Sequence, residues 1–358
     1  MKQNLLKTCI GSGLIIFVLL ILVQCAGLSS SLAGNTQQQS NDSENETLFP
    51  VYQEITISQG SANLPVTQFP EIWAYVVAGR ESALMRGLPL TDIGYFGMEV
   101  DAYGKLVDIP KRQSINFQGR VHLVAACSSR SLTHFILLEG RPERKALINE
   151  LIAAARPYDG LQIDYEYVPA RDGEAYLSFL RELREGLQGK MLTVALPART
   201  RKIADDVYDY EKILPIVDRI LVMAYDEHWS GSAAGSVASL DWCRRVAEYS
   251  IRTIGQNKLI MGMPFYGRAW GDYTPSRALV HSTIAGIIKD EKVDNVRYEN
   301  GIPMFTYNKN VSIKVYYEDE YSLSRRMEMY KSMNVRAIGF WRLGQETMEI
   351  WKYLKLSQ

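Results

Sequence analysis

Residues 158–169 have the sequence Tyr-Asp-Gly-Leu-Gln-Ile-Asp-Tyr-Glu-Tyr-Val-Pro, which predicts a buried strand that ends in carboxylates. Successive side chains of a strand point to opposite faces, so Gln162, Asp164 and Glu166 share one face. Three polar groups in a row are costly to bury unless their face lines a cavity. Because the two acids are so close, we expect a raised pKa for at least one of them, as a general acid requires. On spacing alone, a strand end with solvated charges that caps the following helix is an equally good interpretation.

The composition favours a large globular domain with a neutral surface. The chain has 358 residues, of which 47% are hydrophobic, so a substantial core can form. Lysine and arginine together number 40, as do aspartate and glutamate. This balance indicates neither a nucleic-acid partner nor electrostatic binding to a membrane surface. Aromatic side chains are plentiful and suit the faces of sugar rings, although most are expected to pack in the core.

The N-terminus has the features of an export signal. Lys2 and Lys7 precede an unbroken apolar run over residues 14–23, which is short for a transmembrane helix. The run leads to Cys25, and this junction resembles a bacterial lipoprotein signal, in which the cysteine becomes the lipidated first residue. Gln24 departs from the small residue usual there, and an uncleaved signal anchor is the alternative. Both place the protein in the cell envelope, anchored to a bacterial membrane and facing the periplasm or the exterior.

Three regions follow from this pattern. Residues 1–25 are expected to be a signal peptide with a lipobox, and residues 26–50, rich in Ser, Asn and Gln, a flexible tether. Residues 51–358 are expected to form the folded domain. Its two cysteines, Cys127 and Cys243, could form a disulfide in an exported protein, but their apolar surroundings favour free thiols. The histidines show no metal-ligand spacing, so we expect no metal and no cofactor.

From residue 71 onward, β-prone and helix-prone segments alternate, which predicts an α/β fold. Eight strands are the number that closes a (β/α)8 TIM barrel, whose active sites lie at the carboxyl ends of the strands. The long segment between the seventh and eighth strands is expected to be a small α+β insertion, about residues 268–317, that forms one wall of the cleft. The predicted strands are residues 72–78, 92–100, 121–127, 161–166, 191–196, 219–225, 258–264 and 336–341. The predicted helices are residues 142–155, 172–187, 210–216, 237–250, 318–333 and 345–354.

Four motifs resemble those of glycoside hydrolase family 18, and they occur in the family's order. Residues 159–166 (DGLQIDYE) resemble its fourth-strand signature, which ends in Glu. Residues 223–226 (MAYD), 262–268 (GMPFYGR) and 339–344 (GFWRLG) are similar to its sixth-, seventh- and eighth-strand motifs. Within the family, the chain resembles the bacterial spore-cortex and cell-wall N-acetylglucosaminidases. Gln162 stands where most of the family has Asp, and where this branch tends to have an amide residue, commonly Asn.

The resemblance implies retaining hydrolysis of a β-1,4 bond beside N-acetylglucosamine, in which the acetamide oxygen of the substrate attacks the anomeric carbon. Glu166 would be the general acid and then the base, Asp164 would orient the acetamide, and Tyr225 would donate a hydrogen bond to it. Peptidoglycan is the leading expected substrate and chitin oligosaccharides the second, and we expect a monomer. The residues expected to bind substrate are Gln162, Asp226, Trp341, Arg268, Tyr266, Trp229 and Tyr75, with Trp341 as the floor under the sugar.

Two alternatives come from other classes of protein: a glycan-binding lipoprotein in which Gln162 marks weak or lost catalysis, and a structural lipoprotein of the envelope. The presence of Asp164, Glu166 and Tyr225 together argues against both. Because Gln162 is neutral, we expect Asp164 to ionise more readily than it would beside a second acid. Glu99, near the end of the second strand, could reach the cleft, although core filling is at least as plausible for it.

Overall fold

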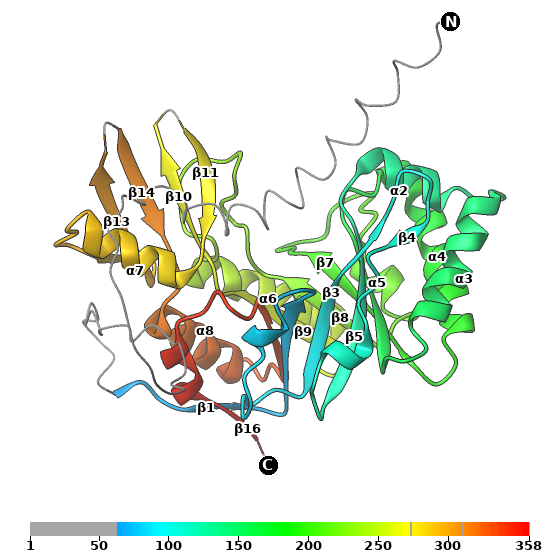
Figure 1. Cartoon of the computed structure of the whole chain (residues 1–358), viewed down its shortest axis with the longest axis horizontal. Coiled ribbons are helices and arrows are strands. Elements are labelled where there is room, and N and C mark those ends of the chain that lie inside the picture. Colours follow the sequence, from blue (N-terminus) through cyan, green and yellow to red (C-terminus); the bar gives the residue numbers. More distant parts are fainter. Residues whose placement is uncertain (1–62, 273, 310, 358) are drawn as a thin grey trace, which may run out of the picture. The chain divides into compact units, whose positions relative to one another are not determined.

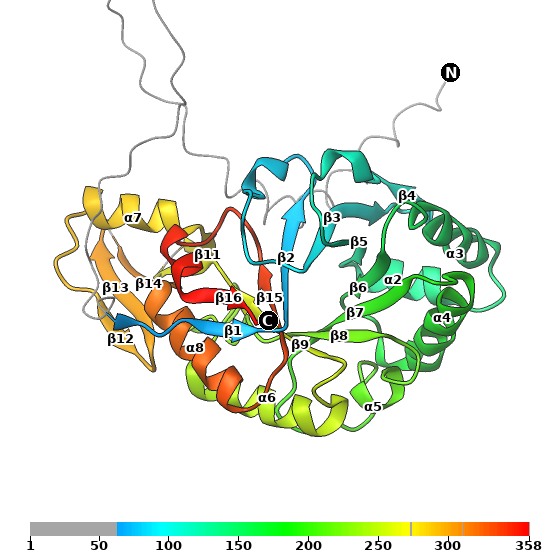
Figure 2. The same ribbon diagram turned by 90° about the horizontal axis from the view of Figure 1, so that it is seen from below.

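The computed structural model describes residues 63–272, 274–309 and 311–357, so the predicted signal, lipidation site and tether lie outside the described residues. Eight parallel strands close into a barrel (Figures 1 and 2) because the last strand pairs with the first and the first with the second. The predicted TIM barrel is therefore confirmed. In their order around the ring, the strands are β2 (Glu71–Val77), β3 (Asp92–Val100), β5 (Arg120–Cys127), β6 (Gly160–Tyr165), β7 (Met191–Pro197), β8 (Arg219–Met223), β9 (Leu259–Pro264) and β15 (Ala337–Trp341).

Helices cover the outside of the barrel, and local capping sets where several of them begin. The predicted helix 237–250 is shifted toward the C-terminus, because the Ser239 hydroxyl accepts the Trp242 N–H at 3.4 Å and starts the helix at Leu240. Asp319 and Ser322 form a reciprocal capping box at the start of the last α-helix. The α-helices between barrel strands are α2 (Arg130–Leu137), α3 (Pro142–Ala154), α4 (Gly173–Gly186), α5 (Tyr210–Ile213), α6 (Leu240–Ile254) and α8 (Glu320–Ser332).

Some connections differ from the predicted helices. The segment predicted as helix 345–354 forms only the 3₁₀ turn η5 (Met348–Tyr353), and the chain then enters strand β16 (Leu354–Leu356). That strand pairs in parallel with β1 (Thr67–Phe69), a long-range contact that local periodicity cannot reveal. The first two barrel connections contain no α-helix. They contain η2 (Glu81–Ala83), β4 (Leu106–Val107) and η3 (Arg112–Ser114).

The predicted insertion between the seventh and eighth barrel strands is present as a five-stranded antiparallel sheet with one helix, α7 (His281–Asp290). It lies on the side of the barrel away from α3 and α4 (Figures 1 and 2). In sheet order, its strands are β11 (Thr274–Leu279), β10 (Gly267–Gly271), β14 (Ser312–Tyr316), β13 (Ile302–Asn308) and β12 (Arg297–Glu299).

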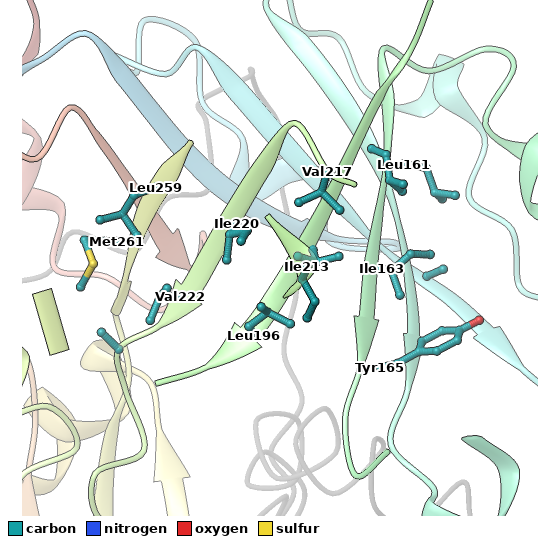
Figure 3. Packing of buried hydrophobic residues seen from close by; sticks show 14 of the residues in the cluster. Leu161, Ile163, Tyr165, Leu196, Ile213, Val217, Ile220, Val222, Leu259 and Met261 are labelled. Carbon is teal, nitrogen blue, oxygen red and sulfur yellow. The ribbon is translucent and has the colours of Figure 1, made fainter. Parts of the chain in front are cut away.

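The main core lies between the outer face of the barrel and its helices. On β6, Leu161, Ile163 and Tyr165 are buried along one side of the strand (Figure 3), and Tyr165 stacks on Phe179 of α4. Since side chains alternate along a strand, this packing turns Gln162 and Asp164 toward the interior of the barrel. Cys127 and Cys243 are buried free thiols, as predicted. Within the part of the chain that the structure describes, no helix is long and apolar enough to cross a membrane.

Candidate active site

The end of β6 holds the two predicted catalytic acids, and backbone hydrogen bonds on both sides fix it. Asp164 is 8% exposed and pairs in register with Ala126 of β5. The Glu166 N–H donates to the Cys127 carbonyl at 2.8 Å, so Glu166 stands directly beyond the last residue of the strand. The Tyr208 hydroxyl donates to the Tyr165 carbonyl at 2.8 Å and accepts the Val168 N–H at 2.9 Å. The chain on either side of Glu166 is thereby anchored to the barrel.

Gln162 lies one step deeper in the barrel than Asp164, and the protein already engages both ends of its amide. Its Oε1 accepts a hydrogen bond from the Tyr75 hydroxyl, and its Nε2 donates to Thr193 Oγ1 at 3.1 Å. Gln162 is fully buried and Tyr75 is 2% exposed. Tyr75 and Gln162, both predicted to bind substrate, therefore connect β2, β6 and β7 below the acids. Their hydrogen-bonding groups are used within the protein and do not point to a sugar.

Burial, followed by a neighbouring negative charge, raises the pKa of both acids. Burial raises the pKa of Asp164 well above its ordinary value, and the neighbouring charge of Glu166 raises it further. The pKa of Glu166 is raised by burial first and then by the charge of Asp226. Although Gln162 is neutral, it gives Asp164 no hydrogen bond, and Asp164 Oδ1 has no partner among the described residues. Asp164 is therefore not readily ionised, because burial outweighs the effect expected from the neutral neighbour.

The ends of β8 and β9 bring together a second group of predicted residues. Asp226 Oδ1 accepts a hydrogen bond from the Tyr266 hydroxyl at 2.6 Å and lies 3.5 Å from Arg268 Nη2. The Tyr225 ring lies edge-on to Tyr266, with the ring centroids 6.3 Å apart. Glycine is needed at position 262, since a Cβ there would lie 2.7 Å from the Val222 carbonyl oxygen and 3.2 Å from the Tyr225 ring.

The charges of the neighbouring acids act on the hydroxyl of Tyr225. Burial raises its pKa well above the ordinary value, and the negative charges around it, including those of Asp164, Asp226 and Glu166, act in the same direction. The phenol is therefore protonated near neutral pH and acts as a neutral hydrogen-bond donor or acceptor.

Trp341 ends β15 and presents an indole ring to the same end of the barrel. Its ring centroid lies 5.2 Å from that of Tyr75 and 5.1 Å from that of Phe96, which it meets edge-on. These contacts hold the indole as an apolar platform. Trp229 lies instead on the loop after β8, is 54% exposed, and has its backbone N–H bonded to Ser232 Oγ at 2.9 Å. Its predicted contact with substrate stays a prediction.

A third carboxyl joins this end of the barrel, and strand alternation alone would have misplaced it. The register between β3 and β5 shifts between Phe96 and Met98, where Gly97 adopts a φ of 155°. The shift pairs Glu99 with Ala126, which itself pairs with Asp164, so both acids face the barrel interior on either side of a small side chain. Burial, followed by the charge of Asp108, raises the pKa of Glu99. The glycine within a β-prone segment was the one signal for this bulge.

Three of the four described histidines have a local hydrogen-bond partner, and the His281 ring lies against Tyr317. His122 Nε2 lies 2.8 Å from Asp92 Oδ1, His134 Nδ1 lies 2.8 Å from Asp172 Oδ2, and His228 Nδ1 lies 2.8 Å from the Ser236 carbonyl oxygen. Within residues 63–357 as far as they are described, no three His, Cys, Asp or Glu side chains gather in a way that could hold a metal ion.

A parallel barrel that gathers acids of raised pKa, a buried phenol and an indole platform at its carboxyl end has the arrangement of an enzyme active site. Residues 120–346 match the sequence profile of glycosyl hydrolases family 18, which is more than half of the chain. The chain belongs to this family.

The most similar relatives include bacterial enzymes named for sporulation and the spore cortex. A Bacillus subtilis protein whose name calls it a sporulation-specific glycosylase, YdhD, is 33% identical over 244 residues, which cover 62% of this chain and 56% of YdhD. The cortical fragment-lytic enzyme of Bacillus subtilis is 29% identical over 290 residues, which cover 74% of this chain and 67% of that enzyme. The present chain thus spans little more than half the length of the first relative.

Solved structures of the family share the fold. The spore cortex-lytic enzyme SleL of Bacillus cereus superimposes with a TM-score of 0.70 at 23% identity, over 81% of this chain and 76% of SleL. A chitinase from Chromobacterium violaceum gives the same TM-score of 0.70 at 20% identity, over 79% of this chain and 97% of that chitinase. At these identities the likeness establishes the barrel and not the substrate.

Proposed function

We propose that this protein cleaves β-1,4 bonds beside N-acetylglucosamine with the help of the substrate's own acetamide group, and that peptidoglycan is its substrate, with chitin oligosaccharides second. The observation that carries the proposal is the placement of Asp164 and Glu166 on one face of one strand. In the ordinary retaining scheme the acid and the nucleophile flank the scissile bond. Two acids that approach a sugar from the same side do not flank it, which favours attack by the acetamide group of the substrate.

Each residue then has one role. Protonated Glu166 gives its proton to the glycosidic oxygen as the acetamide oxygen bonds to the anomeric carbon and the leaving sugar departs. Asp164 accepts a hydrogen bond from the acetamide N–H through its unprotonated oxygen, and its ionised form, which the developing positive charge favours, stabilises the oxazolinium ion. Tyr225 donates a hydrogen bond to the acetamide oxygen, and Trp341 supports the sugar from below. Glu166 then takes a proton from the water that opens the oxazolinium ring, which restores the acid and retains the anomeric configuration.

Asp226 and its partners support this chemistry from the opposite wall. After burial, the negative charge of Asp226 raises the pKa of Glu166 and so favours its acid form. Tyr266 and Arg268 hold that carboxylate in place, with Tyr266 donating its hydroxyl. The arrangement stabilises the acid form of Glu166 without placing a competing hydrogen bond on it.

The proposal includes export and anchoring through Cys25. It rests on the two lysines, the apolar run at residues 14–23 and the cysteine that follows it. The Cys25→Ser variant should lose incorporation of labelled fatty acid in a bacterial host, and the mature protein should leave the membrane fraction. If the variant stays in the membrane fraction, and neither the wild type nor the variant incorporates fatty acid, the N-terminus is an uncleaved signal anchor.

The decisive test of activity is mass spectrometry of purified peptidoglycan and of chitohexaose after incubation with the full-length protein in detergent. New reducing N-acetylglucosamine ends are expected from the wild type. Glu166→Gln should slow their appearance at least about 10²-fold, since it removes the general acid. Glu328→Gln, on the exposed side of α8 and in a surface ion pair, serves as the matched control and should be as active as the wild type. Glycan binding without products would favour a binding lipoprotein and overturn the proposal.

A further inference from the structure

A hollow of about 440 Å³ lies between the segments that follow β5 and β6, at the carboxyl end of the barrel. One wall is the first turn of α2, which follows β5. The other is the start of the 3₁₀ turn η4 (Ala170–Asp172), which follows β6 and Glu166. The two walls join where Thr133 Oγ1 lies 3.4 Å from the Tyr167 carbonyl oxygen. The lining residues are Arg130, Ser131, His134, Pro169, Ala170 and Arg171.

Two arginines give this hollow an excess of positive charge. Arg130 and Arg171 are both exposed, and neither has an acidic side chain within ion-pair distance among the described residues. Elsewhere in the barrel, arginines such as Arg120, Arg184 and Arg199 pair with carboxylates. An unpaired guanidinium offers a planar fork of N–H donors that fits a carboxylate in a bidentate arrangement.

One carboxylate stands near these arginines, and it is already engaged. Asp172, which directly follows Arg171, is 5% exposed, and both of its oxygens lie within 2.9 Å of His134 Nδ1. Its charge is therefore directed at the imidazole and away from the hollow. The net charge that a ligand would meet comes from the two guanidinium groups.

The position of the hollow relates its charge to the substrate. Pro169, which lines the hollow, is the third residue after Glu166, so the hollow lies within reach of a substituent on a sugar next to a scissile bond at Glu166. The insertion lies on the other side of the barrel and contributes nothing to this wall (Figure 1). Chitin carries no charged substituent on any sugar. Peptidoglycan carries a lactyl-linked peptide with free carboxylates on every second sugar.

We infer that the Arg130–Arg171 hollow binds a carboxylate of the peptide carried by the sugar next to the scissile bond. The hollow would then be the feature that selects peptidoglycan over chitin. This inference rests on the proposed function, because it takes a glycan to be the substrate, and it adds a binding group that recognises a substituent outside the glycan backbone.

The test compares one glycan in two charge states. Soluble peptidoglycan strands with free peptide carboxylates are prepared beside the same strands with those carboxyls amidated, and kcat/KM is measured for the full-length protein. The wild type should prefer the free carboxylates about tenfold, and the preference should shrink at high salt because exposed charges are screened. In the R130Q/R171Q double variant the two strands should be cleaved at the same rate. Hydrolysis of chitohexaose should be unchanged.

The matched control is R244Q/R245Q, which removes two exposed arginines from α6 and should keep the wild-type preference. A wild type that cleaves both strands equally, or a double variant that keeps the preference, overturns the inference while the proposed function stands. Calorimetry with a disaccharide tetrapeptide and its amidated form measures binding to the hollow without catalysis. If the protein hydrolyses nothing but binds the free carboxylate form more tightly, the proposed function fails while the inference about the hollow stands. Equal affinity for the two forms, or stronger competition by glycerol phosphate than by the peptide carboxylate, would also overturn the inference.

Discussion

Removing the hydroxyl of Tyr75 should destabilise the barrel while leaving most of the activity. In the structure this hydroxyl donates to Gln162 Oε1, and both side chains are buried. Tyr75→Phe leaves the amide oxygen without a donor, which costs about 1–3 kcal/mol of the free energy of unfolding. For a domain of this size the Tm should fall by about 2–5 °C, at roughly 1.6 °C per kcal/mol. Because neither group reaches a sugar, kcat should fall less than about tenfold.

The assay combines thermal unfolding with steady-state hydrolysis of a chitooligosaccharide, on Tyr75→Phe, Gln162→Leu and the double variant. The two single changes break one hydrogen bond, so the double variant should be more stable than the sum of the singles predicts, by about 1 kcal/mol. A Tyr75→Phe protein with unchanged Tm and a loss of kcat/KM greater than about 10²-fold would refute this reasoning, since the hydroxyl would then act on substrate and not on Gln162.

Three further predictions concern charge and capping. Asp226→Asn removes a negative charge that raises the pKa of Glu166. The alkaline limb of the kcat/KM profile, where Glu166 loses its proton, should therefore move to lower pH. Asp226→Glu should keep that limb in place. Arg326→Met leaves the fully buried Glu318 without its ion-pair partner, which lies 2.9 Å away. The free energy of unfolding in urea should fall by about 3–5 kcal/mol. An unchanged urea midpoint would count against a structural role for the pair. Ser239→Ala removes the cap of α6 and should cost about 1 kcal/mol by the same measurement, whereas Ser239→Asp should restore the wild-type midpoint.

Sequence periodicity placed the eight barrel strands because each is a short apolar run between turn residues, and barrel strands are buried on both faces. It could not place β16, whose partner β1 lies at the other end of the folded domain. It also misjudged the end of the chain as helix, since the apolar spacing of residues 345–354 fits a helix as well as a turn followed by a strand. In that case a tertiary contact overrode local propensity.

The acids of the site were predictable and their surroundings were not. Asp164 and Glu166 stand in a local motif, so their spacing alone indicated the shared face. The partners of Gln162 come from β2 and β7, and the bulge at Gly97 that turns Glu99 inward depends on pairing with β5. Such contacts join residues far apart in the chain, and no periodicity records them. The Arg130–Arg171 hollow is a further case, formed by two loops that only the folded barrel brings together.

Buried carboxyls at the two ends of the barrel have pKa values shifted in opposite directions, lowered for Asp92 at the amino end and raised for Asp164 at the carboxyl end. At the amino end, Asp92 is fully buried, which alone would raise its pKa, but hydrogen bonds from His122 and Arg120 bring that pKa below its ordinary value. At the carboxyl end, Asp164 is buried with one oxygen unpartnered, and its pKa is raised. In barrel enzymes the amino end serves stability and the carboxyl end serves catalysis.

Opposite pKa shifts predict opposite effects of the same substitution. The lowered pKa of Asp92 stabilises the fold above the carboxyl's unfolded pKa, and this stability is lost as pH falls through the folded pKa. The raised pKa of Asp164 has the reverse sign: the fold loses stability as pH rises from the unfolded pKa through the folded one. At neutral pH, Asp92→Asn should therefore lower the Tm, while Asp164→Asn should raise it and abolish hydrolysis.

Thermal melts of both variants between pH 4 and pH 8 check the signs. The gain from Asp164→Asn should shrink toward acid pH, where the wild-type carboxyl is protonated and carries no charge to bury. The loss from Asp92→Asn should likewise shrink as the wild-type ion pair is protonated. An Asp164→Asn protein that is less stable than the wild type at pH 8 would mean that the unpartnered oxygen is hydrogen-bonded in the free enzyme. In that case burial of an unpartnered carboxyl would not be destabilising the fold, and the explanation given for the raised pKa of Asp164 would be wrong.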